Sequence, residues 1–162
     1  MKQIRKGAAF VLLAIALVAG VQSFISCDLE GSDSSSDSLL GYWKSSWGDG
    51  FELYYENLQL KFKQYDDAEK NLSFAGNVVN KPDLTAESGY LIIQITDGGS
   101  WGKTERYYYA VHWKSFLGDT LKGAAAYKDE GENSGLPTAE EATEEYTVEN
   151  GYYTFYGDYE RQ

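Results

Sequence analysis

The chain has a single cysteine and few basic residues. Its 162 residues include one Cys, 14 Lys and Arg, and 25 Asp and Glu, so its formal net charge is −11. One cysteine excludes an intramolecular disulfide and a cluster of thiolate metal ligands. Nucleic acids and anionic lipids are attracted by a basic surface, which this composition does not provide. We therefore expect a domain that is stabilised by packing alone and has no nucleic-acid partner.

The chain also lacks an apolar run of full membrane-spanning length near its N-terminus. A basic start is followed by an apolar run of 15 residues, 7–21. As a helix this run would be roughly 22 Å long, whereas a bilayer core is about 30 Å thick. The pattern predicts a cleaved secretory signal peptide over residues 1–26. The alternative is a transmembrane anchor over residues 7–25, although two polar residues interrupt it.

The one cysteine, Cys27, ends the sequence Phe-Ile-Ser-Cys (24–27), which resembles the lipobox of bacterial lipoproteins. In that family the signal peptidase cuts before the cysteine, whose sulfur then carries a diacylglyceryl group. Ser26 fits the small residue before the cut, and Phe24 stands where Leu is usual, as in the relaxed lipoboxes of spirochaetes. The resemblance implies a membrane anchor of palmitate-like acyl chains, in which each buried CH₂ contributes about 0.8 kcal/mol. Cleavage at a nearby position, which would leave a free thiol, is the alternative.

The residues after the cysteine differ in composition from the rest of the chain. Residues 27–38 are rich in Ser and acidic residues and have no aromatic side chain. Such a segment buries too little apolar surface to fold and stays solvated. We therefore expect a flexible tether over residues 27–38 and a single β domain over residues 39–162. The protein would then be exported and lipid-anchored to the inner or outer membrane of a bacterial envelope.

Alternation of apolar and polar residues dominates the domain and predicts strands. A capping box, Thr138 with Glu141, follows Pro137 and predicts one short helix near the C-terminus. The fold is expected to be mainly β, as an antiparallel up-and-down barrel or a closed sheet of about eight strands. The predicted strands span residues 41–47, 51–64 (a hairpin), 71–79, 89–96, 106–116, 120–127 and 151–159. The stretch 120–127 has small side chains, so another element is expected to approach it closely.

The hairpin at residues 51–64 has a register that the sequence suggests directly. A two-residue turn at residues 56–57 would bring apolar residues together on one face and opposite charges on the other. The expected pairs are Tyr55 with Leu58, Leu53 with Leu60, Phe51 with Phe62, and Glu52 with Lys61.

Two resemblances concern the domain. Gly41-Tyr42-Trp43 resembles the Gly-x-Trp signature of lipocalins, which are eight-stranded barrels with a ligand cavity. That likeness implies that Arg161 packs over Trp43, although lipocalins place their helix after the last barrel strand and here a predicted strand follows it. The second likeness is to small lipoproteins of treponeme-type spirochaetes. It rests on the Trp-Lys-Ser-x-x-Gly-Asp turn at Trp43, on YYYAVHWKS (107–115) and on ATEEYTVENGYYTFY (142–156). It implies a surface or periplasmic lipoprotein and transfers no catalytic residue.

The segment GGSWG (98–102) matches the letters of the Gly-x-Ser-x-Gly nucleophile elbow. That elbow requires a helix after the serine, whereas a strand pattern follows here. His112 is the one imidazole that could act as a base, and the alternation places it on the face opposite Trp113. We therefore expect a Gly-rich hairpin loop and assign no catalytic residue and no cofactor. A hydrolase acting on envelope or host glycans is a distant alternative.

The segment DEGENSG (129–135) resembles a calcium-binding loop. Asp129, Glu132 and Asn133 offer oxygen ligands, but Gly131 stands where such loops carry Asp or Asn. A solvated acidic turn is the alternative, and no other metal site is expected.

Aromatic residues near glycine turns are the candidates for binding. Trp47 and Trp101 sit beside such turns, and Tyr108 follows in the next predicted strand; loops of this kind often carry function. They suggest a non-catalytic binding module for a carbohydrate, a lipid or a protein. A structural or antigenic coat protein without a small ligand is the alternative. A deep, aromatic-lined cavity would favour the first class, and a barrel filled by its own side chains would favour the second.

Overall fold

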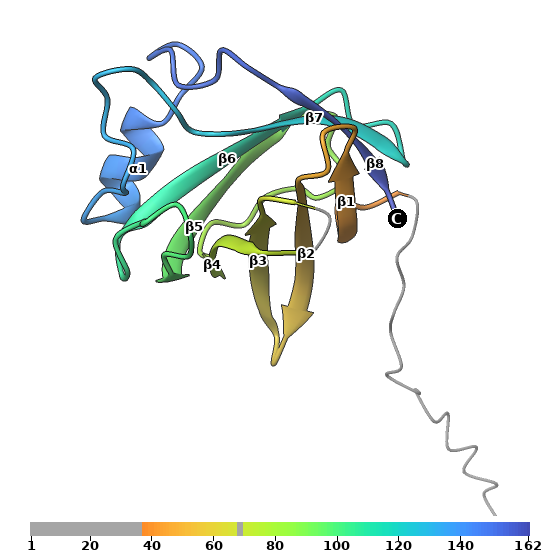
Figure 1. Cartoon of the computed structure of the whole chain (residues 1–162), viewed down its shortest axis with the longest axis horizontal. Coiled ribbons are helices and arrows are strands. Elements are labelled where there is room, and N and C mark those ends of the chain that lie inside the picture. The colour runs from red at the N-terminus through yellow and green to blue at the C-terminus, as the bar shows by residue number, and fades with distance from the viewer. Residues whose placement is uncertain (1–36, 68–69) are drawn as a thin grey trace, which may run out of the picture. The chain divides into compact units, whose positions relative to one another are not determined.

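In the computed structural model, which describes residues 37–67 and 70–162, eight strands close into an antiparallel barrel (Figure 1). Each strand pairs with the next one along the chain, and the last pairs with the first. A short helix, α1 (Ala139–Glu145), lies between β7 and β8 and packs against β5 and β6. The predicted up-and-down barrel with one short helix is confirmed. The strands are β1 (Gly41–Ser45), β2 (Gly50–Glu56), β3 (Gln59–Tyr65), β4 (Leu72–Val78), β5 (Gly89–Asp97), β6 (Tyr108–Lys114), β7 (Thr120–Ala125) and β8 (Gly157–Arg161).

The predicted signal peptide, Cys27 and most of the predicted tether lie outside the described residues. The tether's last residue, Ser38, is described, and its carbonyl accepts a hydrogen bond of 2.5 Å from Arg161 Nη2. In the described part of the chain, no helix has the length and apolarity needed to cross a membrane.

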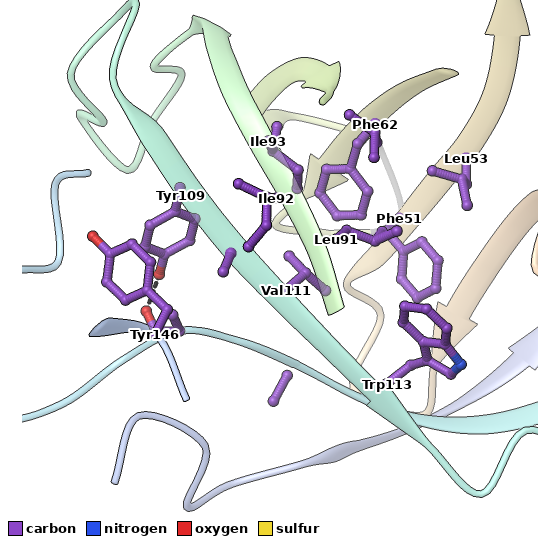
Figure 2. Packing of buried hydrophobic residues seen from close by; sticks show 14 of the residues in the cluster. Phe51, Leu53, Phe62, Leu91, Ile92, Ile93, Tyr109, Val111, Trp113 and Tyr146 are labelled. Carbon is purple, nitrogen blue, oxygen red and sulfur yellow. Dashed lines mark hydrogen bonds between the residues drawn. The ribbon is translucent and has the colours of Figure 1, made fainter. Parts of the chain in front are cut away.

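Aromatic rings fill the interior of the barrel (Figure 2). Phe51, Phe62 and Phe74, on three successive strands, have 4% of their surface exposed or less. The ring centroids are 5.7 Å apart for Phe51 and Phe62 and 5.5 Å apart for Phe62 and Phe74. The row continues to Trp43 on one side and to Tyr109 on the other, at 6.0 Å and 5.4 Å. Such contacts stabilise the fold beyond the area they bury, and alternation along each strand is what brings these rings inside.

Two glycines leave room for large rings to lie close to the backbone of the sheet. A Cβ on Gly123 of β7 would lie 3.2 Å from the ring of Tyr159 on β8. A Cβ on Gly89 would lie only 2.4 Å from the ring of Trp113, its partner across the ladder. At Gly123 the ring of Tyr159 from β8 thus lies close to the small-residue strand, in agreement with the expected close approach of another element.

The register expected for the β2–β3 hairpin is wrong by two residues. The turn is at residues 57–58 rather than 56–57, so Leu53 pairs with Phe62 and Glu52 pairs with Lys63. Asn57 and Leu58 have φ angles of 50° and 64°. Two-residue hairpin turns favour positive φ at both central residues, and Asn adopts such angles readily. Because the shift is an even number, the residues that stay in the two strands keep their predicted faces of the sheet. Leu58 does not, because it lies in the turn and is 98% exposed.

The last predicted strand, 151–159, begins only at Gly157. The tyrosines that precede it pack instead of pairing in the ladder. Tyr152 lies edge-on to Tyr146, with ring centroids 5.0 Å apart, and Tyr153 lies 5.3 Å from His112. The capping box of α1 is confirmed, because Thr138 Oγ1 accepts from Glu141 N and the Glu141 carboxylate accepts from Thr138 N.

Arg161, on the last strand, joins this strand to the first strand of the barrel and to the residues just before it. Its guanidinium carbon lies 4.4 Å from the ring centroid of Trp43, as the resemblance to the Gly-x-Trp signature implied. It donates to the carbonyls of Ser38, Leu40 and Gly118. A planar cation with several donors suits this task, because it can stack on a ring and bind several carbonyls at once. The contact holds β1 and β8 together where the barrel closes.

Candidate functional site

One end of the barrel contains a hollow of about 560 Å³. Residues from the connections after β1, β5 and β7 line it. In an up-and-down barrel these connections lie at the same end, because each follows a strand that runs in the same direction. We call this hollow, with its rim of Trp47, Trp101, Tyr127 and Phe155, the mouth.

The rim of the mouth is unusually rich in exposed rings. Trp47 is 82% exposed, Phe155 84%, Tyr127 56% and Trp101 42%. They are four of the ten large hydrophobic side chains that are exposed in the described part of the chain. Scattered apolar residues on a surface are ordinary, whereas exposed rings clustered around a hollow are typical of binding surfaces.

Trp101 is held in place by Asp66. The indole Nε1 donates to Asp66 Oδ1 at 2.6 Å, and the same carboxylate accepts from Ser73 Oγ at 2.5 Å and from Ser100 Oγ. The ring also lies 5.7 Å from that of Phe74 in the barrel wall. The rim ring is therefore oriented before any ligand arrives, which reduces the entropy lost on binding.

The Gly-rich loop at residues 98–102 is pinned to β4. Ser100 N donates to Leu72 O at 3.0 Å, and Trp101 N donates to Ser73 O at 3.2 Å. Gly99 has a φ of 50°, and a Cβ there would lie 2.2 Å from Ser73 O, so no other residue fits this approach. The glycines of the motif thus let the backbone lie against the strand and set the position of Trp101.

The ionised form of Asp66 is stabilised by the hydrogen bonds that its carboxylate accepts. Burial raises the pKa of this carboxyl, but hydrogen bonds from Ser100, Ser73 and Trp101 outweigh burial and lower the pKa below its usual value. Asp66 is therefore ionised at neutral pH, and hydrogen bonds to a charged acceptor are the stronger kind.

Lys103 lies in the wall of the mouth. Its Nζ is 3.7 Å from the ring centroid of Tyr109 and 5.4 Å from that of Trp101, and it donates to the carbonyl of Asn133. Burial lowers the pKa of Lys103 to about 8, and the carboxylate of Glu132 opposes this in part. The ammonium is thus mainly charged at pH 7 while much of its hydration is replaced by rings.

The opposite charge in the mouth, Asp49, is already bound by its neighbours. One carboxylate oxygen accepts from the hydroxyl of Tyr159 at 2.8 Å, and the other accepts from Ser45 Oγ. Asp49 therefore serves to hold the ring of Tyr159 against the wall.

Of the three predicted ligand-binding residues, the structure brings Trp47 and Trp101 together in the mouth. Tyr108 lies elsewhere, half-buried on β6, where its hydroxyl accepts from Gln94 Nε2 at 3.0 Å. Sequence reasoning did not find Lys103, Tyr127 and Phe155. A signal was present, since all three fall in connections that follow odd-numbered strands and so lie at the same end.

Ser100 and His112, which the elbow interpretation would pair, have different partners. Ser100 Oγ donates to Asp66, whereas His112 Nδ1 lies 2.8 Å from the hydroxyl of Tyr156. Burial lowers the pKa of His112 to about 4, Lys114 adds to this effect, and Glu149 opposes it. The loop at residues 98–102 leads to β6 and not to a helix, as the Gly-rich hairpin interpretation expected.

The predicted calcium-loop residues are engaged in local turns. Asp129 Oδ1 accepts from the hydroxyl of Tyr127, Glu132 Oε1 accepts from Ser134 N, and Asn133 Oδ1 accepts from the amide of Lys128. Within residues 37–67 and 70–162, no group of three or more His, Cys, Asp and Glu side chains is placed to hold a metal ion. The segment is arranged as an acidic turn.

Comparison with protein-family models, with curated proteins and with solved structures finds no match.

Proposed function

We propose that this chain is a non-catalytic binding module of a bacterial cell envelope, and that the mouth of its barrel binds a carbohydrate. The observation that carries the proposal is the gathering of Trp47, Trp101, Tyr127 and Phe155 around a hollow of about 560 Å³. A hollow of that volume, with rings and a few polar groups, is of the size that small ligands occupy.

The chemistry of the mouth favours a sugar over a lipid tail. The interior of the barrel is occupied by Phe51, Phe62, Phe74 and their neighbours, so an acyl chain finds no apolar tunnel below the mouth. The mouth itself is lined by aromatic rings together with hydroxyl, amide, ammonium and carboxylate groups. The CH face of a pyranose packs against a ring, and its hydroxyls hydrogen-bond to such groups.

A coat protein without a small ligand remains the second candidate, and the filled barrel interior is the observation that favours it. In that function the rim rings would contact neighbouring proteins. The two functions differ in whether a free saccharide binds the mouth.

The proposed location depends on Cys27 and the lipobox-like sequence before it. An acylated Cys27 would hold the barrel on the inner or outer membrane, and the Ser- and Asp-rich segment would separate the two. Mass spectrometry of the protein extracted from cells is expected to find residues 1–26 removed and Cys27 carrying acyl chains. A free thiol, or a retained N-terminal segment, would contradict this part of the proposal.

Binding is tested with the whole protein in lipid nanodiscs on an array of neutral and acidic oligosaccharides. We expect Trp47→Ala and Trp101→Ala each to weaken binding to the saccharides that the unaltered protein retains by about tenfold, or about 1.4 kcal/mol. The matched control is Tyr55→Ala, because this ring is also exposed and lies on the β2–β3 hairpin away from the mouth.

If no saccharide binds, or if the two tryptophan variants bind as tightly as the control, the mouth is not a carbohydrate site. The coat function then stands in its place.

A further inference from the structure

Lys103 is a basic residue whose contacts in the mouth are with a backbone carbonyl and with aromatic rings. Among the described residues that line this hollow, it carries the one positive charge. Its Nζ donates to a backbone carbonyl, that of Asn133, and lies over the ring of Tyr109. Among residues 37–67 and 70–162 no carboxylate forms an ion pair with it. A partly buried ammonium without an anionic partner is costly, and it becomes favourable when a ligand supplies the anion.

The rest of the mouth does not supply that anion. Asp49 accepts hydrogen bonds from Tyr159 and Ser45, and Asp66 accepts them from Trp101, Ser100 and Ser73. Glu132 is near enough to act on Lys103 through its charge, but its Oε1 accepts from the amide of Ser134. Apart from the N–H that donates to the carbonyl of Asn133, the donors of the ammonium therefore remain available to a ligand that enters between the rim rings.

We propose that the saccharide bound in the mouth carries a carboxylate, as a uronic acid does, and that Lys103 Nζ binds this carboxylate. This inference rests on the proposed carbohydrate function and specifies its ligand. The sugar ring stacks between Trp101 and the exposed rings of Trp47 and Phe155, and its acid group points inward to Lys103. Lys103 thereby selects acidic sugars over neutral ones.

The negative charge of the whole chain limits the number of acid groups that a bound saccharide can carry. The formal net charge is −11, so a polyanion is repelled from most of the surface. Such repulsion is screened beyond about 10 Å at moderate salt, whereas a contact with Lys103 is not. The mouth therefore suits a short saccharide with a single uronate better than a polyuronate.

The test compares two ligands that differ only in charge. The probes are a trisaccharide with one glucuronate residue and the methyl ester of the same trisaccharide, titrated into the whole protein in lipid nanodiscs. We expect the acid to bind at least about tenfold more tightly than the ester. Lys103→Met is expected to remove this preference, and Lys103→Arg is expected to keep most of it because the charge remains.

The matched control is Lys114→Met. Lys114 also places its Nζ over a ring, 3.6 Å from the centroid of Tyr156, but it does not line the mouth. This variant is expected to keep the full preference for the acid.

The outcomes separate this inference from the function on which it rests. If the acid and the ester bind equally well to the unaltered protein, Lys103 does not select a carboxylate, and the carbohydrate function stands without it. If the preference survives in Lys103→Met, another residue binds the acid and the assignment to Lys103 is wrong. If neither compound binds and the oligosaccharide array is also blank, the proposed function and the inference fail together. If the array still shows neutral saccharides bound, only the inference fails.

Discussion

Replacing Phe62 by alanine is expected to lower the free energy of unfolding by about 3–5 kcal/mol. Phe62 is fully buried on β3, and its ring lies between those of Phe51 and Phe74 at 5.7 Å and 5.5 Å. Truncation removes both contacts and leaves a cavity that the closed barrel cannot collapse to fill. Urea denaturation followed by circular dichroism measures the change. A loss below about 1 kcal/mol would mean that the interior is not packed as described.

The matched control for this substitution is Phe155→Ala at the mouth. Phe155 is 84% exposed, so its loss is expected to change stability by less than about 0.5 kcal/mol. The two variants are expected to differ in the same way in binding, with the effect reversed between them: the one that is stable loses affinity and the destabilised one keeps it. Phe155→Ala weakens saccharide binding, whereas Phe62→Ala leaves the affinity of the folded protein close to that of the unaltered chain. If Phe62→Ala abolished binding while the protein remained folded, the ligand site would lie within the barrel rather than at its mouth.

Arg161→Ala is the substitution with the second largest expected effect, a loss of about 3 kcal/mol in the free energy of unfolding. The guanidinium donates to three backbone carbonyls and stacks on Trp43. Without Arg161 the partly buried carbonyls have no donor to compensate for their lost hydration, which destabilises the fold. The stacking energy with Trp43 is lost as well. The ion pair between Arg161 Nε and Asp119, at 3.3 Å, adds little because Asp119 is exposed.

A second variant at Arg161 and a control at Lys122 show which property of Arg161 stabilises the barrel. Arg161→Lys keeps the charge but not the planar fork, so about half of the loss is expected. Lys122→Met breaks the exposed ion pair between β7 and Asp158 and is expected to cost less than about 1 kcal/mol. Urea denaturation measures all three variants. Equal stability of Arg161→Ala and Lys122→Met would show that Arg161 does not hold the barrel closed.

The sequence predicts the faces of the strands better than it predicts their pairing. Phe51, Leu53 and Phe62 point inward as alternation requires, because a residue's face depends only on its place within its own strand. The turn between them depends on which two residues adopt positive φ. Alternation cannot distinguish residues 56–57 from residues 57–58, because both choices keep the paired strand residues on the same faces.

The same difference between local and long-range information applies to the residues of the candidate site. Trp47 and Trp101 could be proposed because each lies next to a glycine turn, which is local information. Lys103 could not be identified, because its environment is made by Tyr109 on β6 and by the carbonyl of Asn133 beyond β7. Asp66 was missed for a similar reason, since it lies 35 residues before the indole that it positions. Contacts of this kind exist only after the barrel has closed.

Binding of a saccharide at the mouth is tested most directly by following the indole N–H signals of the tryptophans by NMR while the glucuronate-bearing trisaccharide is titrated in. The chain has four tryptophans. Trp47 and Trp101 stand at the mouth, whereas the indoles of Trp43 and Trp113 are buried and donate to Leu39 O and Ala86 O. We expect the signals of Trp47 and Trp101 to shift and saturate together while the other two stay in place. Four unmoved signals, or a shift of Trp43 and Trp113 alone, would contradict this expectation.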